Sequence, residues 1–332
     1  MSGGFRRRKK CYGSGVMQRR WLGVFVLAGS LSASTARASA PSVAPRVLAE
    51  YPHDAGAFTQ GLVHHDGWFY ESTGLRGSSS LRRVAPATGA VDISVALAQT
   101  EFGEGLALVG DRLIQLTWQE EVAHVYRLES FEPLTDHEYT GEGWGLCFDG
   151  LQLIMTDGSD QLSFRDPESF ALLGSQRVSD DGVPVEQLNE LECVDGLVLA
   201  NVWMTDRIAV IDPRTGRVLQ WVDARGLLTE EEAASADVLN GIARDATSGH
   251  FYVTGKLWPK LFEVELELPR AASNPEQEPA PPGRTSERPR GCAMCSVAQR
   301  SSQNLLGAGW LLVLSLVVWR RLSPGGARFR AG

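Results

Sequence analysis

The chain has 332 residues, with 32 lysines and arginines against 40 aspartates and glutamates, so its formal net charge is −8. This acidic balance leaves no basic surface of the kind that binds a phosphate backbone, and it excludes nucleic acid as a partner. Hydrophobic residues make up 43% of the sequence, which is ordinary for a globular protein and sufficient for a sizeable core.

The N-terminal segment, residues 1–40, has the features of a secretory signal peptide. From Met17 it carries a basic start, an apolar run from Trp21 to Leu31, and the small residues Ala38 to Ala40, after which cleavage is expected. Either Met1 or Met17 can serve as the start. A single membrane anchor is the alternative, but the apolar run is short for a span. We therefore predict that the protein is exported.

The C-terminal part predicts attachment to a membrane. Residues 269–291 are rich in proline and charge and are expected to form a disordered linker. Residues 292–332 combine Cys292 and Cys295 with an apolar run from Leu305 to Trp319 and an arginine pair. This tail resembles the C-terminal sorting tails of myxobacterial surface proteins, in which a cysteine beside the span is anchored. The alternative is a plain membrane helix, although about 15 residues fall short of the roughly 20 that a span needs. Both interpretations place the domain outside, at the cell surface or envelope.

Between these ends, residues 41–268 repeat one pattern: an apolar strand, a tight turn, a second apolar strand, and a third strand. The copies begin at Gly61, Gly105, Gly145, Leu191 and Gly241, which lie 44, 40, 46 and 50 residues apart. Such a period is typical of β-propeller blades, whereas a parallel β-helix has a shorter one. The fold class is therefore expected to be all-β, a five-bladed β-propeller, with Arg46 to Asp54 as the strand that closes the ring. The segment from Thr229 to Ala236 predicts one short capped helix.

Cys147 and Cys193 are the two cysteines of the propeller segment. In an exported protein they can pair as a disulfide. Buried free thiols are the alternative, because cysteine is among the most buried residue types. The sequence leaves both possibilities open.

Propeller geometry brings one residue before each first strand and one after each second strand to the same face, at the mouth of the central channel. These positions hold Gln60 and Glu71, Glu104 and Trp118, Trp144 and Asp157, Asn189 or Glu190 with Trp203, and Asn240 with Lys256. Each tryptophan alone could be a packing residue, and Lys256 alone could be a surface lysine. Their convergence predicts a polar, aromatic-walled pocket for a small molecule.

Several short motifs occur in order along the propeller segment: FTQGL, YESTG, FGEGL, LTW, GEGWGL, TDGSD, LNELE, NVW, LNGIA and TGKLWP. In this respect the chain resembles the plant-type glutaminyl-peptide cyclotransferases, which also occur in bacteria, from about Val47 to Leu268. The resemblance implies a five-bladed propeller, unrelated to the zinc-dependent animal enzymes of the same activity. One departure is Arg76, where the family often carries an uncharged or aromatic residue.

The resemblance implies that the substrate is a peptide or protein with an N-terminal glutamine, which is converted to pyroglutamate with release of ammonia. The α-amine attacks the side-chain amide carbon of the same residue, so the enzyme holds a reactive conformer and moves protons. On this basis Glu71 is expected to be the general acid and base, with a pKa raised by the pocket. Lys256 either stabilises the oxyanion or tunes Glu71.

The other candidate residues are expected to bind the substrate. Gln60 and Asn189 would hydrogen-bond it, Trp118, Trp144 and Trp203 would wall the pocket, and Glu104 with Asp157 would bind the amine or orient neighbours. No metal or other cofactor is required, although a structural calcium is possible, and a monomer is expected. Two alternatives remain: a non-catalytic binding module, and a metal-dependent lactonase or hydrolase on the same fold.

Overall fold

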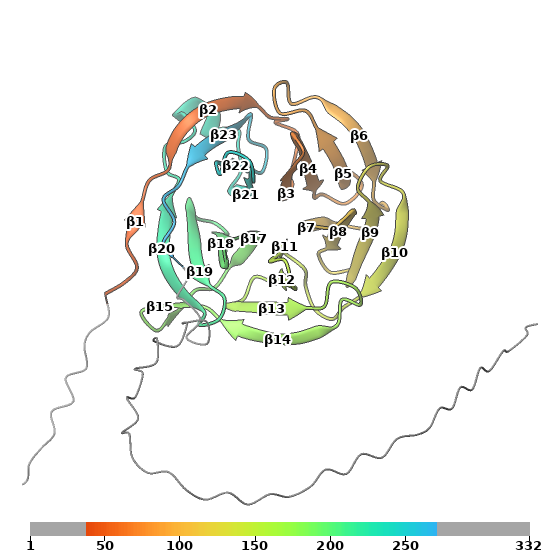
Figure 1. Ribbon diagram of the computed structural model, residues 1–332. Coiled ribbons are helices and arrows are strands. Elements are labelled where there is room, and N and C mark those ends of the chain that lie inside the picture. Colours follow the sequence, from red (N-terminus) through yellow and green to blue (C-terminus); the bar gives the residue numbers. More distant parts are fainter. Residues whose placement is uncertain (1–37, 271–332) are drawn as a thin grey trace, which may run out of the picture. The chain divides into compact units, whose positions relative to one another are not determined.

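Five sheets surround a common axis in the computed structural model, which describes residues 38–270 (Figure 1). Four of the sheets have four antiparallel strands, and the fifth has seven, of which four form the antiparallel blade. The predicted five-bladed propeller is confirmed. The innermost strands are β3 (Thr59–His65), β7 (Gly103–Val109), β11 (Leu146–Phe148), β17 (Leu188–Val194) and β21 (Leu239–Arg244). The second strands are β4 (Trp68–Thr73), β8 (Arg112–Thr117), β12 (Leu153–Met155), β18 (Leu197–Val202) and β22 (Phe251–Gly255).

The third and fourth strands lie progressively farther from the axis. The third strands are β5 (Ser80–Val84), β9 (Val122–Arg127), β13 (Gln161–Arg165), β19 (Arg207–Asp212) and β23 (Lys260–Glu265). The outermost strands are β6 (Val91–Ala96), β10 (Pro133–Glu138), β14 (Leu172–Arg177), β20 (Arg217–Asp223) and β2 (Arg46–Pro52). β2 comes from the N-terminal side and pairs antiparallel with β23, so the first strand of the propeller completes its last blade. The predicted closure of the ring is confirmed.

Apolar residues hold the blades together, because each of the five hydrophobic clusters lies between two neighbouring blades. The cluster between blades 4 and 5, for example, packs Leu199 and Val210 against Ile242 and Phe262. Burying a side chain of this size stabilises a fold by about 1.5–3 kcal/mol. The alternation of apolar residues along each strand therefore produces both the sheets and the contacts between them.

Glycines let the inner strands approach one another closely. A Cβ added at Gly61, Gly105 or Gly145 would come within 2.5 Å or less of a backbone atom of the next inner strand. This close approach explains why a glycine begins several copies of the repeat, and it brings the residue before each glycine to the axis.

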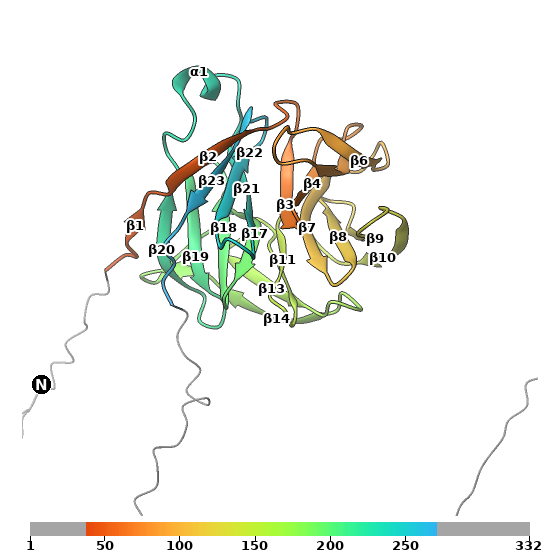
Figure 2. The same ribbon diagram turned by 45° about the horizontal axis from the view of Figure 1, so that its top comes forward.

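Smaller elements decorate blade 4. β1 (Ser42–Val43) pairs in parallel with β20, and the hairpin of β15 (Ser179–Asp180) and β16 (Val183–Pro184) extends the same sheet. The helix α1 (Glu230–Ala233) projects beside this part of the propeller (Figure 2). Its N-cap Thr229 and Glu232 form a capping box, which confirms the predicted short helix.

A disulfide joins Cys147 of β11 to Cys193 of β17, so the inner strands of blades 3 and 4 are covalently linked. Within residues 38–270, no helix combines the length and the apolarity that a membrane span requires. Nearly all of the predicted signal peptide and linker, and the whole of the C-terminal tail, lie outside the described residues and stay predictions.

Candidate active site

A cavity of about 400 Å³ opens at one end of the axis, beside the first residues of the inner strands. It is lined by Phe58, Gln60, Phe102, Glu104, Trp118, Trp144, Asn189, Trp203, Met204, Asp237 and Lys256. Seven of the nine residues predicted from the sequence meet here; Glu71 and Asp157 do not. The cavity thus gathers residues from all five blades, as the repeat indicates.

Glu104 and Lys256 are the buried charged groups of this cavity, with 4% and 5% of their surface exposed. Glu104 Oε1 accepts a hydrogen bond of 2.9 Å from Gln60 Nε2. Lys256 Nζ lies 4.9 Å from the centre of the Phe58 ring, and within the described residues it forms no ion pair shorter than 4.0 Å. Both groups therefore line the cavity without forming an ion pair with each other.

Burial governs the protonation of both groups. It raises the pKa of Glu104 well above its ordinary value, although the positive charge of Lys256 opposes this. It lowers the pKa of Lys256, although the carboxylates of Glu104 and Asp237 oppose that change. A carboxyl that holds a proton at higher pH than usual, beside a partly desolvated amine, is suited to proton transfer.

Indole rings form the wall of the cavity, and hydrogen bonds to Glu142 hold two of them in place. Trp118 Nε1 and Trp144 Nε1 both donate to Glu142 Oε2, at 2.8 and 3.0 Å. The rings of Trp144 and Trp203 meet edge to face with centroids 5.6 Å apart. Glu142 therefore orients two of the three tryptophans. Both indole N–H groups are occupied, so these rings present apolar surface to a ligand.

Arg76 lies at the rim beside the same wall. Its guanidinium stacks over the Trp118 ring at 5.3 Å from the centroid and pairs with Glu120 at 2.6 Å. The departure from the family pattern therefore falls on a residue that does not line the cavity but contacts its aromatic wall.

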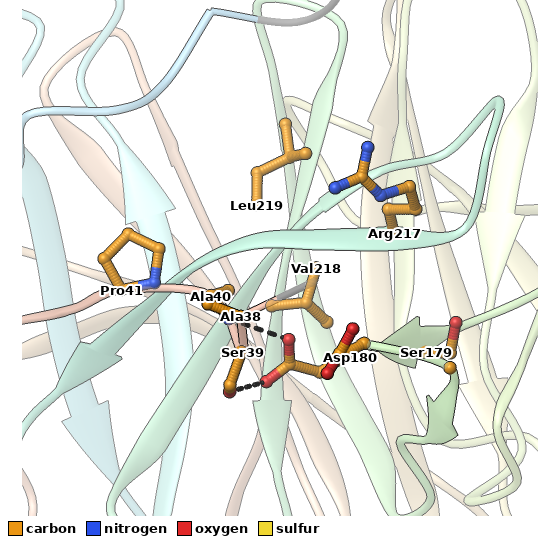
Figure 3. Close-up of a pocket in the computed structure, with 11 residues that line it drawn as sticks. Ala38, Ser39, Ala40, Pro41, Ser179, Asp180, Arg217, Val218 and Leu219 are labelled. Atoms are coloured by element: carbon orange, nitrogen blue, oxygen red, sulfur yellow. Dashed lines mark hydrogen bonds between the residues drawn. The ribbon is translucent and has the colours of Figure 1, made fainter. Parts of the chain in front are cut away.

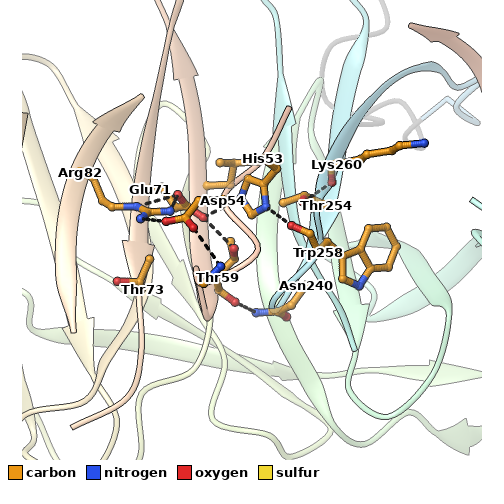
Figure 4. Close-up of polar contacts among 12 residues, drawn as sticks. His53, Asp54, Thr59, Glu71, Thr73, Arg82, Asn240, Thr254, Trp258 and Lys260 are labelled. Atoms are coloured by element: carbon orange, nitrogen blue, oxygen red, sulfur yellow. Dashed lines mark hydrogen bonds and ion pairs between the residues drawn. The ribbon is translucent and has the colours of Figure 1, made fainter. Parts of the chain in front are cut away.

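Glu71 does not reach the cavity, and its predicted place there is wrong. Strand pairing sets Leu62 opposite Glu71, so Glu71 lies within β4 and not after it. Its carboxylate accepts hydrogen bonds from Thr59 and Arg82 and pairs with His53 (Figure 4). Burial alone would raise its pKa, but the charges of His53 and Arg82 outweigh burial and hold the pKa at about 2. The expected rise in pKa is therefore also wrong.

Asp157 is likewise misplaced by the prediction. Its side chain is exposed and accepts hydrogen bonds from the backbone N–H and hydroxyl of Ser159 in a local turn. Strand pairing shows why both positions were misjudged: the residues that match Trp118 are Gly74 in blade 1 and Gly158 in blade 3. A Cβ at either glycine would lie 2.4 or 2.7 Å from the rings of Phe102 and Trp144, respectively.

Four residues of the cavity were missed from the sequence: Phe58, Phe102, Met204 and Asp237. A usable signal existed for the two phenylalanines, because each stands two residues before a polar site residue in FTQGL and FGEGL. Met204 and Asp237 lie in loops outside the repeat, and no sequence signal marks them.

Within residues 38–270, no group of three or more histidines, cysteines, aspartates or glutamates is arranged to hold a metal ion. The predicted structural calcium is not tested by this observation and stays a prediction.

A second cavity, of about 430 Å³, lies where residues 38–41 cross blade 4 (Figure 3). Asp180 accepts hydrogen bonds there from Ser39 Oγ and from Ala40 N, at 2.5 and 2.8 Å. This cavity contains none of the predicted site residues, so the axial cavity is the candidate active site.

A propeller whose axial cavity combines a buried carboxylate, a lysine and an indole wall has the features of a small-molecule site, and comparison with known proteins identifies the family. The family model described as glutamine cyclotransferase matches residues 22–266. The chain is 42% identical over 233 residues to glutaminyl-peptide cyclotransferase of Arabidopsis thaliana, covering 68% of this chain and 72% of the relative. It is 41% identical to Myxococcus xanthus glutaminyl cyclase, whose crystal structure matches with a TM-score of 0.62 over 68% of this chain and 97% of that one.

The chain belongs to the glutamine cyclotransferase family, and its enzymatic function is that of a glutaminyl-peptide cyclotransferase.

Proposed function

We propose that the axial cavity binds the N-terminal glutamine of a peptide or protein, and that Glu104 is the group that moves its proton. The observation that carries this proposal is the position of Glu104: it is the buried carboxylate of the cavity, and it lies on the wall that Lys256 also lines. Glu104 thus takes the role that the sequence alone assigned to Glu71.

In the first step, the α-amine of the bound glutamine attacks its own side-chain amide carbon. A nitrogen–carbon bond forms, the carbonyl electron pair moves to oxygen, and the amine proton passes to Glu104. In the second step the carbonyl reforms, the bond to the amide nitrogen breaks, and Glu104 returns the proton to the departing nitrogen. Ammonia leaves and a five-membered lactam remains, so atoms and protons balance.

The remaining polar groups fit the needs of this reaction. Lys256 supplies positive charge for the oxygen that becomes negative in the first step. Asn189 is buried, and its Oδ1 has no hydrogen-bond partner within the described residues, which leaves it free to accept from an amine or amide. The indole wall excludes water, and this strengthens each electrostatic contact in the cavity.

Two matched substitutions test the assignment. Glu104→Gln should reduce ammonia release from a glutaminyl dipeptide by about 10²–10⁴-fold, because the general acid and base is lost. Glu71→Gln should retain turnover per folded molecule, because Glu71 does not line the cavity. Near-normal turnover in Glu104→Gln, with loss confined to Glu71→Gln, would overturn the proposal. Adding a chelator to the wild type should leave the rate unchanged, and loss of activity would require a metal instead.

We also propose that the enzyme is an exported monomer held at a membrane through residues 292–332. The apolar run and the two cysteines in the sequence of this segment support attachment, and the disulfide of the propeller fits an oxidising compartment. Deleting residues 292–332 should release the enzyme from the membrane fraction with its activity intact. Cys292→Ala and Cys295→Ala should separate covalent anchoring, which needs a cysteine, from a plain membrane helix, which does not.

A further inference from the structure

Asn240 does not line the cavity, but it forms a hydrogen bond with Gln60, which does. It lies in β21 with none of its surface exposed, and its side-chain nitrogen donates two hydrogen bonds. One goes to the backbone oxygen of Thr59 at 2.9 Å, and the other to Gln60 Oε1 at 3.0 Å. Figure 4 shows the contact between Asn240 and Thr59. Asn240 therefore links blade 5 to the residue that holds Glu104.

The donor and the acceptor of each hydrogen bond from Asn240 through Gln60 to Glu104 are fixed. A backbone carbonyl can only accept a hydrogen bond, so the end of Asn240 that faces Thr59 must be its NH₂ group. The second hydrogen of that NH₂ then requires an acceptor, and the nearer end of Gln60 must be its oxygen. The NH₂ group of Gln60 is thereby turned toward Glu104, where Oε1 accepts from it at 2.9 Å. Asn240 Oδ1 has no partner within the described residues, and this agrees with a side chain used only as a donor.

We propose that Asn240 is a positioning residue of the cyclotransferase: through its two donated hydrogen bonds it keeps the amide of Gln60 turned so that Gln60 can only donate to Glu104. With Oε1 occupied in this way, the proton that Glu104 carries during the reaction resides on Oε2, which accepts no hydrogen bond within residues 38–270. This inference rests on the proposed role of Glu104.

Loss of Asn240 removes the constraint on Gln60. The Gln60 amide can then turn over and offer its oxygen to Glu104, which favours a protonated Glu104 with the proton on Oε1, away from the substrate. Turnover should fall about tenfold, the effect of one hydrogen bond, while KM should change little because Asn240 does not touch the cavity. Glu104 should also titrate at higher pH.

Other charges that act on Glu104 stay in place in this comparison. Lys256, which follows β22, lowers the pKa of Glu104, whereas Glu142 and Glu120, from the loops near β8 and β11, raise it. The phenol of Tyr139 also interacts with Glu104 and has its own pKa raised by burial. None of these side chains hydrogen-bonds Asn240, so a change in the titration of Glu104 reports on Gln60.

The experiment compares Asn240→Ala and Asn240→Leu with Asn201→Ala in the full-length chain. The alanine variant removes the donor and the leucine variant removes it while refilling the space, so at least one is expected to fold. Asn201 is the matched control, because it is a buried asparagine whose Oδ1 accepts the N–H of Gly241 and which forms no hydrogen bond with Gln60 among the described residues. Glutamate labelled with ¹³C at Cδ reports the titration directly, and the Glu104 signal is the one missing from Glu104→Gln.

Both Asn240 variants should move the Glu104 titration upward by about one pH unit, and Asn201→Ala should not. The inference is overturned if Glu104 titrates at the wild-type pH in a folded Asn240 variant, or moves equally in Asn201→Ala. Failure of the proposed function has a different signature, since Glu104→Gln would then retain wild-type turnover whatever the titrations show.

Discussion

Gln60 of blade 1 donates to Glu104 of blade 2 at 2.9 Å, so the buried carboxylate of the active site is held by a neighbouring blade. The same cavity takes Lys256 from blade 5 and its indoles from blades 2, 3 and 4. No blade contains the site by itself. The geometry of the site therefore depends on how the blades pack around the axis.

Lys256→Met separates the two roles that a lysine can play beside Glu104. Loss of oxyanion stabilisation should lower kcat by about 10²–10³-fold at every pH. Because Lys256 also lowers the pKa of Glu104, its loss should raise that pKa further and shift the acidic limb of the kcat/KM profile to higher pH. Lys260→Met is the control, since Lys260 pairs with Glu50 and Glu232 away from the cavity. A shifted profile with unchanged maximal turnover would leave Lys256 with tuning alone.

Gly158→Ala tests the packing of the indole wall. The added Cβ would lie 2.7 Å from the Trp144 ring, so the ring must move and KM should rise several-fold. Gly249→Ala is a close control, because Gly249 has a similar φ of 78° against 82° but no atom within 4 Å of its Cβ position. Backbone strain is common to both variants, and only Gly158→Ala should affect KM. Equal kinetic effects would show that strain alone is responsible.

Glu71 should stabilise the propeller in a pH-dependent way. Its folded-state pKa of about 2 lies below the ordinary value of 4.5, so its contribution is present above about pH 4.5 and is lost as the pH falls toward 2. The difference of about 2.5 units corresponds to about 3 kcal/mol at neutral pH. Urea unfolding of wild type and Glu71→Gln between pH 2 and 6 should show a stability gap that closes in acid. A gap that is constant with pH would contradict the charged network with His53 and Arg82.

Glu190 occupies the position where the other blades have glycine, and it connects blade 4 to blades 1 and 5. Its carboxylate accepts the backbone N–H groups of Leu62 and Ile242, at 3.2 and 2.8 Å. Glu190→Gln leaves one of these buried donors without an acceptor and should cost about 1–3 kcal/mol in the free energy of unfolding. Glu192→Gln, two residues along the same strand, is the control. Burial raises the pKa of both carboxyls, that of Glu192 to about 8, but among residues 38–270 no backbone N–H donates to Glu192, so its neutral replacement should cost little. Equal losses in the two variants would remove the special role of Glu190.

The disulfide between Cys147 and Cys193 should stabilise the fold mainly by restricting the unfolded chain. The two cysteines are 46 residues apart, and a loop of this size corresponds to at most about 4 kcal/mol. The double variant Cys147→Ser with Cys193→Ser should lower the denaturation midpoint while the folded enzyme keeps its activity, since neither cysteine lines the cavity. Unchanged stability in the double variant, or in wild type after reduction, would contradict this role.

Repetition and hydrophobic alternation in the sequence were enough to predict the number of blades, the strand that closes the ring and seven residues of the cavity, and a capping pattern predicted the short helix. These properties are local or periodic: each blade repeats the same strands, and the residue before each inner strand faces the axis for the same geometric reason. Strand ends are less certain in a sequence, because one apolar run can pair in more than one register.

The tertiary structure decided which of two carboxylates lines the axial cavity. Glu71 lies in β4 and Glu104 in β7, but the fold buries Glu71 against Arg82 and places Glu104 in the lining of the cavity. The pKa of Glu71 is therefore lowered and that of Glu104 raised, because neighbouring charges and hydrogen bonds decide whether the effect of burial on a carboxyl is overcome. Those partners come from segments more than ten residues away, and only the folded propeller brings them together.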